Sequence, residues 1–219
     1  MGSGLFDGYK KVSLRTMLEE IGEDDVKKIL SNFSCPLNLD VEYYLKQHAI
    51  EFDKISRTPT TLIFRSYQGQ SVLVGYFSLT NKSIDIPYTI LSNSMRKKVA
   101  KYSDYVHDIH CYRLPSPLIA QLGKNFNNGY NKLITGDELL KMACDRVALS
   151  FETVGGKIAY IECEDSIPLI NFYSNNGFIE FGRRDLDKDE HERIRGNYLV
   201  QMFKIFKSKP IPKKSPLQP

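Results

Sequence analysis

The sequence has no tryptophan, only four cysteines and no long hydrophobic run. The cysteines contain no C-x-x-C pair, which argues against a zinc knuckle or a disulfide framework and predicts reduced, mostly buried thiols. No apolar stretch approaches the roughly 20 residues that a membrane-spanning helix needs. The first residues, MGSGLFDGYKK, lack the apolar segment and cleavage site of a secretory signal. We therefore expect a cytoplasmic protein with no membrane partner.

The excess positive charge lies at one end of the chain. The formal net charge is +4, but the last thirteen residues, KSKPIPKKSPLQP, carry four lysines and no acid. The remaining chain is balanced, with 26 basic and 26 acidic residues, so its charge alone does not predict nucleic-acid binding. We expect residues 207–219 to form a disordered Pro-rich and Lys-rich tail, with a weak contact to an anionic partner as the alternative.

Helical signals dominate the first part of the chain. Residues 13–33 read as two short helices that are broken at Gly22. Apolar residues then recur at helical spacing from about Asp40 to Glu51. We assign residues 1–32 to an N-terminal helical extension, which could form an oligomer contact or cover the substrate side.

The periodicity changes to that of strands after Thr58. TPTTLIFRS and SVLVGYFSLT flank the turn YQGQ and predict a hairpin, SIDIPYTI alternates as a third strand, and a polar helix is expected from Ser92 to Tyr105. The rest predicts strands in DIHCYRL, PSPLIAQLG, KIAYIEC, GFIEFGRR and NYLVQMFKIF, with helices in GDELLKMACDRVALSFE and SIPLINFYSNN. This order predicts a mixed α+β sheet whose central crossover is an amphipathic helix.

The C-terminal part carries a recognisable arrangement. In IAYIECEDSIPLINFYSNNGFIEF a strand leads into a short helix that ends in Tyr173 and then into a Gly-Phe strand, and SPLIAQLGKN and GYNKLITGDELLKMA precede it. This arrangement resembles the GNAT family of N-acetyltransferases. FSCPLNLDVEYYLKQHA, TTLIF and VGYFSLT are similar to the opening of the toxin-type branch. The resemblance covers roughly residues 33–206 and implies a GNAT domain: an α+β fold with a mostly antiparallel sheet, flanking helices and a central β-α-β unit for acetyl-CoA.

The implied reaction moves an acetyl group from acetyl-CoA directly to a primary amine, with no metal. It needs an anchored coenzyme, a neutral amine and a proton for the departing thiolate. The resemblance implies that Tyr173 is the general acid, against the alternative that it is a core aromatic residue. Glu162 is our candidate for the base. Glu164, or Asp108 with His110 on a neighbouring strand, could equally accept the proton, and many family members are thought to use no dedicated base.

The coenzyme site implied by the resemblance combines a strand, a loop and a helix N-terminus. The loop NKLITG keeps only the last glycine of the family motif Q/R-x-x-G-x-G/A, and a side chain at Ile134 is expected to crowd the phosphates. Lys132 and Thr135 could compensate, so we expect a weakened site. The predicted binding residues are Leu122, Gly123, Lys124, Asn131, Lys132, Leu133, Ile134, Thr135, Gly136 and Asn171.

The acceptor stays open at this stage. The toxin-type resemblance implies the α-amine of an aminoacyl-tRNA and an antitoxin partner, whereas a small-molecule or protein amine fits the chemistry equally. Four basic residues on the polar helix could line a tRNA groove or simply form a solvated face; they are Arg96, Lys97, Lys98 and Lys101. A homodimer is a further partner hypothesis. The alternative function is a catalytically weakened GNAT-fold module that binds acyl-CoA or another protein.

Three other patterns receive plain interpretations. HDIHC gathers histidines, an aspartate and a thiol, but alternation along a strand would separate them, so we predict no metal site. Cys163 lacks a nearby cation or helix N-terminus that would make it a nucleophile. The charged run RRDLDKDEHERIRG is interpreted as a solvated loop, with a sensor of substrate charge as the alternative.

Overall fold

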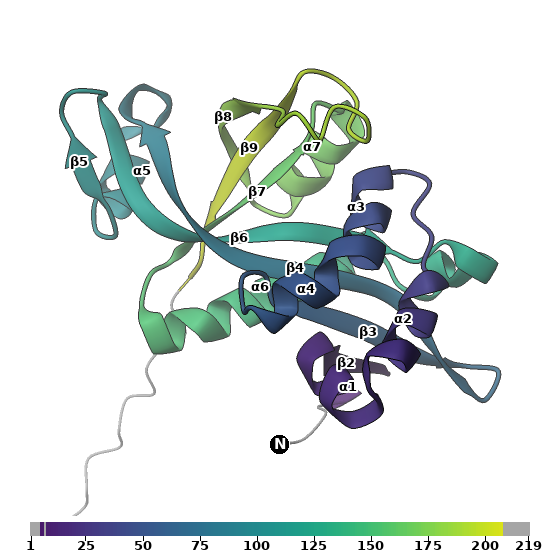
Figure 1. The fold of residues 1–219 in the computed structure, drawn as a ribbon. Coiled ribbons are helices and arrows are strands. Elements are labelled where there is room, and N and C mark those ends of the chain that lie inside the picture. The colour runs from purple at the N-terminus through teal and green to yellow at the C-terminus, as the bar shows by residue number, and fades with distance from the viewer. Residues whose placement is uncertain (1–4, 7, 208–219) are drawn as a thin grey trace, which may run out of the picture.

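A computed structural model describes residues 5–6 and 8–207, and one sheet runs through this part of the chain (Figure 1). The strand order is β1-β2-β3-β4-β6-β7-β9-β8, and β5 pairs with β6. All pairs are antiparallel except β6 with β7. This arrangement confirms the predicted mixed α+β class with a mostly antiparallel sheet. The strands are β1 (Leu5–Phe6), β2 (Tyr9–Ser13), β3 (Thr60–Tyr67), β4 (Gln70–Pro87), β5 (Asp104–Val106), β6 (Cys111–Lys124), β7 (Ile158–Glu164), β8 (Ile179–Asp185) and β9 (Tyr198–Ile205).

Helices cover both faces of the sheet, and successive residues of a strand point into the hydrophobic cores on opposite faces. Leu62 packs in the core beneath α1 to α4, and the next residue, Ile63, packs in the core with α6 and α7. The helices are α1 (Leu14–Ile21), α2 (Glu23–Ser31), α3 (Leu39–Tyr43), the π-helical turn η1 (Tyr44–His48), α4 (Ala49–Lys54), the short η2 (Tyr88–Ile90), α5 (Asn93–Val99), the short η3 (Asn127–Leu133), α6 (Gly136–Val154) and α7 (Ile167–Asn175).

The N-terminal segment is joined to the rest of the sheet. The two predicted helices are present as α1 and α2, which meet at Gly22 with φ of 79°. Strand β2 pairs with β3 along its whole length, and Leu14, Val26 and Leu30 are buried against η1 and α4. The boundaries of the proposed extension stay a prediction, but residues 9–31 supply a strand and core side chains to the same body. The predicted tail lies outside the described residues, apart from Lys207.

Two strands are much longer than the sequence pattern predicts. The predicted hairpin strand and third strand form one strand, β4, and the two strands predicted on either side of Pro115 form one strand, β6. Proline is tolerated there because residues 114–117 of β6 have no strand partner among the described residues on the edge away from β4. The far halves of β4 and β6 form an arm (Figure 1), and Ile86 and Val99 pack there in a hydrophobic cluster that continues to β7, β8 and β9.

The arm also differs from the sequence prediction in its helix and turn. The polar helix ends at Val99, and residues 104–106 form strand β5 instead. Residues 107–110 form a turn in which His110 has φ of 49°, so the strand alternation assumed for HDIHC does not apply. The Tyr105 hydroxyl and His110 Nδ1 lie 3.1 Å apart. Within the described part of the chain, no group of three or more His, Cys, Asp or Glu side chains could hold a metal ion.

Gly123 allows α3 to lie directly on β6. A Cβ atom at this position would lie 2.3 Å from Val41 Cγ1 and 3.3 Å from Phe33 Cζ. Both neighbours are buried and Val41 is β-branched, so neither can move away easily. We expect Gly123→Ala to lower the free energy of unfolding by about 1–3 kcal/mol, as overpacking typically does. Urea denaturation measures this loss. Gly129→Ala, at a position with φ of 72° and open space around it, gives for comparison the cost of backbone strain without a clash.

Candidate active site

The site begins where two parallel strands separate. Strands β6 and β7 pair only at Leu118 with Tyr160 and at Ile119 with Ile161. Beyond these pairs the strands diverge (Figure 1), and no described strand pairs with residues 120–124 of β6 on that edge. A cavity of about 280 Å³ opens at the split. Its walls come from β6, β7, the start of α6, α7, the segment 35–41 and the segment between β8 and β9.

The cavity gathers some of the predicted site residues. Leu122, Gly123 and Lys124 line it from β6, Gly136 lines it from α6, and the two predicted catalytic residues line it from β7 and α7. The remaining predicted coenzyme residues are not part of its lining; they are Asn131, Lys132, Leu133, Ile134, Thr135 and Asn171. Asp108 and His110, the alternative base pair, lie in the turn of the arm and do not reach the cavity.

Tyr173 lies near the end of α7 with its side chain against the cavity. The residue is 8% exposed, and its ring contacts Phe172 and Phe178 edge-on at centroid distances of 5.0 and 5.8 Å. Burial, with smaller contributions from the Cys163 and Cys144 thiols, raises the pKa of Tyr173 well above its ordinary value. Its hydroxyl has no hydrogen-bond partner among the residues that the structure describes. The group therefore stays protonated and free to donate to a molecule in the cavity.

The Cys163 side chain of β7 points to the face of the sheet on which Tyr173 of α7 lies. Burial, together with the charges of Asp165, Glu180 and Glu164, raises the pKa of Cys163 to about 12. A thiol with this pKa carries almost no thiolate at neutral pH, so it is unsuited to act as a nucleophile.

The N-terminus of α6 is closed by a capping box. Thr135 Oγ1 accepts a hydrogen bond from the Glu138 backbone N–H, and the Thr135 N–H donates to Glu138 Oε2 at 2.8 Å. Hydrogen bonds from Thr135 lower the pKa of Glu138, so this carboxylate is charged at neutral pH. Asp137 adds a second acid in the first turn. The helix dipole favours an anion at this end, and the chain's own carboxylates already supply it.

The loop before α6 is held by basic side chains through its carbonyl groups. Lys124 Nζ donates to the carbonyl oxygens of Asn131 and Ile134 at 3.1 and 3.2 Å, and Tyr9 and Arg65 donate to that of Leu133. The Ile134 side chain is buried among core residues, with an extended backbone at φ −145°. The expectation that the Ile134 side chain crowds the phosphates is therefore wrong, because the side chain faces the core.

Glu162 is one member of an ion-pair network at the opposite wall. Its Oε2 accepts from Arg184 Nε at 3.0 Å and its Oε1 accepts from Gln201 Nε2 at 2.9 Å. Arg184 also donates through both terminal nitrogens to the two oxygens of Glu190, each at 2.9 Å. Both oxygens of Glu162 are thus occupied, so its proposed role as a base stays a prediction that competes with an evident structural role.

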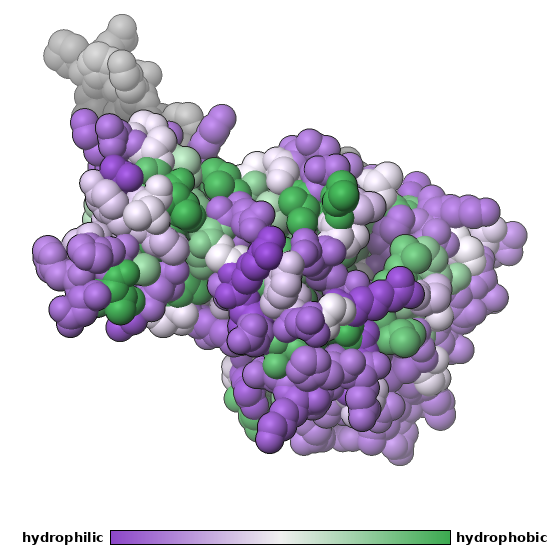
Figure 2. Space-filling view, turned by 90° about the horizontal axis from the view of Figure 1, so that it is seen from above, coloured by the Kyte–Doolittle hydropathy of each residue, from purple (hydrophilic) through white to green (hydrophobic). Residues whose placement is uncertain are grey.

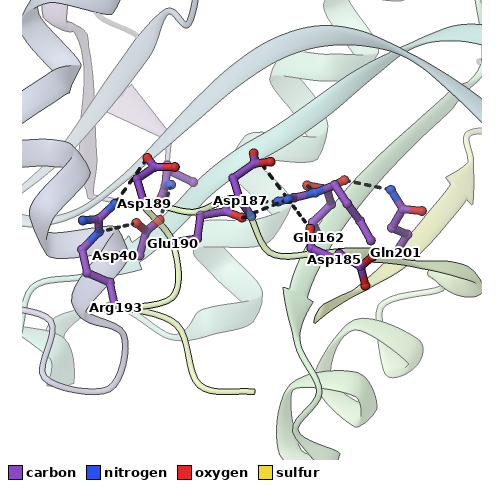
Figure 3. Close-up of polar contacts among 10 residues, drawn as sticks. Asp40, Glu162, Asp185, Asp187, Asp189, Glu190, Arg193 and Gln201 are labelled. Atoms are coloured by element: carbon purple, nitrogen blue, oxygen red, sulfur yellow. Dashed lines mark hydrogen bonds and ion pairs between the residues drawn. The ribbon is translucent and has the colours of Figure 1, made fainter. Parts of the chain in front are cut away.

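The charged segment between β8 and β9 makes polar contacts with α3 (Figure 3), and Glu190 and Ile194 of this segment line the cavity. Arg193 Nε donates to Asp40 Oδ1 of α3 at 3.0 Å, and its guanidinium lies 4.2 Å from the centroid of the Tyr43 ring. Leu186 and Ile194 are buried. The interpretation of this run as a solvated loop holds only in part: most of its residues are exposed, but the Arg184 and Arg193 side chains are only 25% and 17% exposed. The sequence signal was a pair of apolar residues among the charges.

The surface around this end of the molecule is mostly polar. Seen from above, hydrophilic residues cover most of the face, and hydrophobic residues lie between them in separate patches (Figure 2). Across the described ranges, no helix is long and apolar enough to cross a membrane.

Comparison with known proteins gives structural likeness only. No protein-family model matches the sequence, and no curated protein matches it. A structure of AtaT complexed with acetyl-methionyl-tRNAfMet shares 18% identity, with a TM-score of 0.57, over 88% of this chain and 93% of that chain. A tyrosine-to-phenylalanine mutant of KacT shares 15% identity, with a TM-score of 0.57, over 90% and 95%. A similar mutant of the AtaT toxin, bound to the C-terminus of the antitoxin AtaR and acetyl-CoA, shares 14% identity, with a TM-score of 0.55, over 91% and 94%. This likeness, over nearly the whole length of each neighbour, shows that the chain has the GNAT fold.

Proposed function

We propose that the protein is an acetyl-CoA-dependent N-acetyltransferase that moves the acetyl group directly to a primary amine. The observation that carries the proposal is the split between β6 and β7, with Tyr173 in the lining of the cavity that the split creates. An unpaired strand edge offers backbone groups to the amide-bearing arm of the coenzyme. The similar AtaT structure, which contains acetyl-CoA, supports the same use of the fold.

In this proposal Tyr173 is the general acid. When the amine nitrogen attacks the thioester carbon, the C–S bond breaks and the sulfur needs a proton. A buried phenol whose pKa is raised holds its proton across the physiological range. Phe172 and Phe178 fix the ring, so the hydroxyl need not reorganise during the reaction.

The acceptor that we favour is the α-amine of an aminoacyl-tRNA, with a small-molecule or protein amine as the alternative. The complex of AtaT with acetyl-methionyl-tRNAfMet motivates this choice. The basic side chains of α5, Arg96, Lys97 and Lys98, lie on the arm and could contact a large anionic acceptor outside the cavity. We also propose an antitoxin-like partner, by likeness to the complex of AtaT with the antitoxin AtaR. A homodimer is a further part of the proposal.

Calorimetric titration with acetyl-CoA tests the proposal first. We expect micromolar binding of acetyl-CoA and of CoA, followed by release of free thiol when methionyl-tRNA is added. No binding of either coenzyme would contradict an acetyltransferase. Binding without transfer to any amine would favour the second candidate function, a module that binds acyl-CoA without turnover. The acidic start of α6 does not discriminate between the two candidates, because Asp137 and Glu138 would repel the coenzyme diphosphate in both.

The same acidic start leads to a prediction about affinity. Replacing Glu138 by glutamine removes one negative charge next to the loop, while an amide can still accept from the Thr135 N–H. We expect the Kd for acetyl-CoA to fall about fivefold to tenfold, since a charge pair near a protein surface is worth on the order of 1 kcal/mol or more. Calorimetry measures the change. Glu152→Gln, at the other end of α6, is the matched control, and an unchanged Kd for Glu138→Gln would place the diphosphate elsewhere.

A further inference from the structure

The two glutamates of β7 lie on the same face of the strand but have different surroundings. Glu162 and Glu164 are two residues apart, so both side chains point to the face opposite Cys163, and both line the cavity. The Glu162 carboxylate is held by Arg184 and Gln201. The Glu164 carboxylate forms no hydrogen bond and no ion pair with any described residue. Of the two, only Glu164 has oxygens available to an incoming molecule.

Burial and two nearby charged groups together set the pKa of Glu164. Asp40, from α3, disfavours its ionised form, and Arg195, from the segment between β8 and β9, favours it. Asp40 is itself bound by Arg193 and accepts from Gln121 Nε2 at 3.2 Å. Burial is the largest influence, and the net effect raises the pKa of Glu164 above its ordinary value. A carboxylate whose affinity for protons is raised is better suited to proton acceptance than a hydrogen-bonded one.

The position of Glu164 also suits an acceptor. Tyr173 and Cys163 lie on the α6 and α7 side of the sheet, whereas Glu164, Gln121 and Asp40 lie on the α3 side. The split between the strands connects the two sides. A thioester in the split would therefore have the proton donor on one side and Glu164 on the other. This arrangement allows the amine to reach the thioester carbon from the Glu164 side while the sulfur lies next to Tyr173.

We propose that Glu164, and not Glu162, binds the ammonium group of the acceptor and takes its proton. This inference rests on the proposed acetyltransferase function. The Glu164 carboxylate accepts one proton from R–NH3⁺, directly or through water, and leaves the neutral amine. The nitrogen lone pair forms the C–N bond, the C–S electron pair leaves with sulfur, and Tyr173 protonates the sulfur. The resulting phenolate recovers the remaining excess proton from the new amide nitrogen, and Glu164 releases its proton to solvent.

The kinetic test compares the wild type, Glu164→Gln and Glu180→Gln, a change at an exposed glutamate of β8. With acetyl-CoA as donor and methionyl-tRNA as acceptor, we expect Glu164→Gln to lower kcat/KM roughly 100-fold, the lower range for loss of a general base. The wild-type profile should lose activity as the pH falls, because the carboxylate is protonated below its raised pKa. This acidic limb should disappear in Glu164→Gln and persist in Glu180→Gln. Retention of both the rate and the limb in Glu164→Gln would overturn the assignment.

A binding test does not depend on turnover. In protein labelled with ¹³C at the glutamate carboxyl groups, Glu164→Gln assigns the Glu164 signal by its disappearance. We expect saturating methionine amide, a small primary ammonium, to shift this signal and lower the apparent pKa of Glu164. An unmoved signal would overturn the proposal. Failure of the acetyltransferase function itself is distinguishable, because it would abolish acetyl-CoA binding in the wild type, whereas Glu164→Gln should leave that binding intact.

Discussion

Replacing Tyr173 by phenylalanine is expected to lower kcat roughly 100-fold to 1,000-fold while the Kd for acetyl-CoA changes by less than about twofold. The change removes one oxygen atom and keeps the ring that packs between Phe172 and Phe178. The hydroxyl has no partner within the described part of the chain, so its removal leaves no buried group unsatisfied. A selective loss of kcat would therefore reflect the missing proton donor and not a disturbed core.

The measurement combines thiol-release kinetics with calorimetry on the same preparations. Tyr102→Phe, on the exposed surface of the arm, serves as a matched control that removes a hydroxyl far from the cavity. Because burial raises the pKa of Tyr173, the wild-type kcat should not fall on the alkaline side up to about pH 10, the ordinary tyrosine value. Wild-type turnover in Tyr173→Phe would rule out the general-acid role and would support the alternative that Tyr173 is a core aromatic residue.

The helices and the order of elements could be predicted because their signals are local. Helix α6 was predicted in GDELLKMACDRVALSFE; in the structure it begins after a capping residue, Thr135, and ends before Gly155 with φ of 80°. The break at Gly22 is equally local. The short helix before Tyr173 and the strand after Gly177 also follow from their neighbours in sequence. These local signals predicted the mixed α+β class, and the resemblance to the GNAT family supplied the more specific fold.

The long strands and the loop conformation depend on distant partners. Pro115 looks like a strand break, yet pairing with Ser83 continues through it. Ile134 replaces the glycine of a family motif, and sequence alone suggested crowding. The backbone at this position is extended, so glycine is not required there, and the side chain reaches the core. Tertiary packing decided both cases.

The candidate site could be predicted only in part, because some of its contacts join residues that are far apart in the sequence. Residues on the diverging end of β6 and on α7 follow from their place in the fold. The segment between β8 and β9 does not, because the ion pairs that hold it, Arg193 with Asp40 and Arg184 of β8 with Glu162, join residues far apart in the sequence. Read alone, fourteen mostly charged residues resemble solvated loop. Only the folded structure distinguishes the occupied Glu162 from the available Glu164.

The ion-pair network at the cavity predicts the second large effect. Arg184 satisfies both Glu162 and Glu190, whose side chains are 9% and 18% exposed. We expect Arg184→Gln to lower the free energy of unfolding at pH 7 by about 2–3 kcal/mol, somewhat below the ~3–5 kcal/mol for a fully buried pair. Urea denaturation measures it. Arg183→Gln, which removes the neighbouring exposed guanidinium with its 3.8 Å ion pair to Glu180 and its 2.8 Å hydrogen bond to the Tyr198 hydroxyl, should cost less than about 1 kcal/mol.

The pH dependence of this difference identifies its cause. Burial opposes ionisation of Glu190, but hydrogen bonds from Arg184 and from the Asp187 N–H outweigh it and lower the pKa of Glu190. A carboxylate with a depressed folded pKa stabilises the fold fully above its unfolded value of about 4.3, and this stabilisation is lost as the pH falls through the folded pKa. The gap between wild type and Arg184→Gln should therefore narrow below about pH 4. A gap that stays constant down to pH 3 would mean that packing of the Arg184 stem, and not its charge, holds the segment on the cavity.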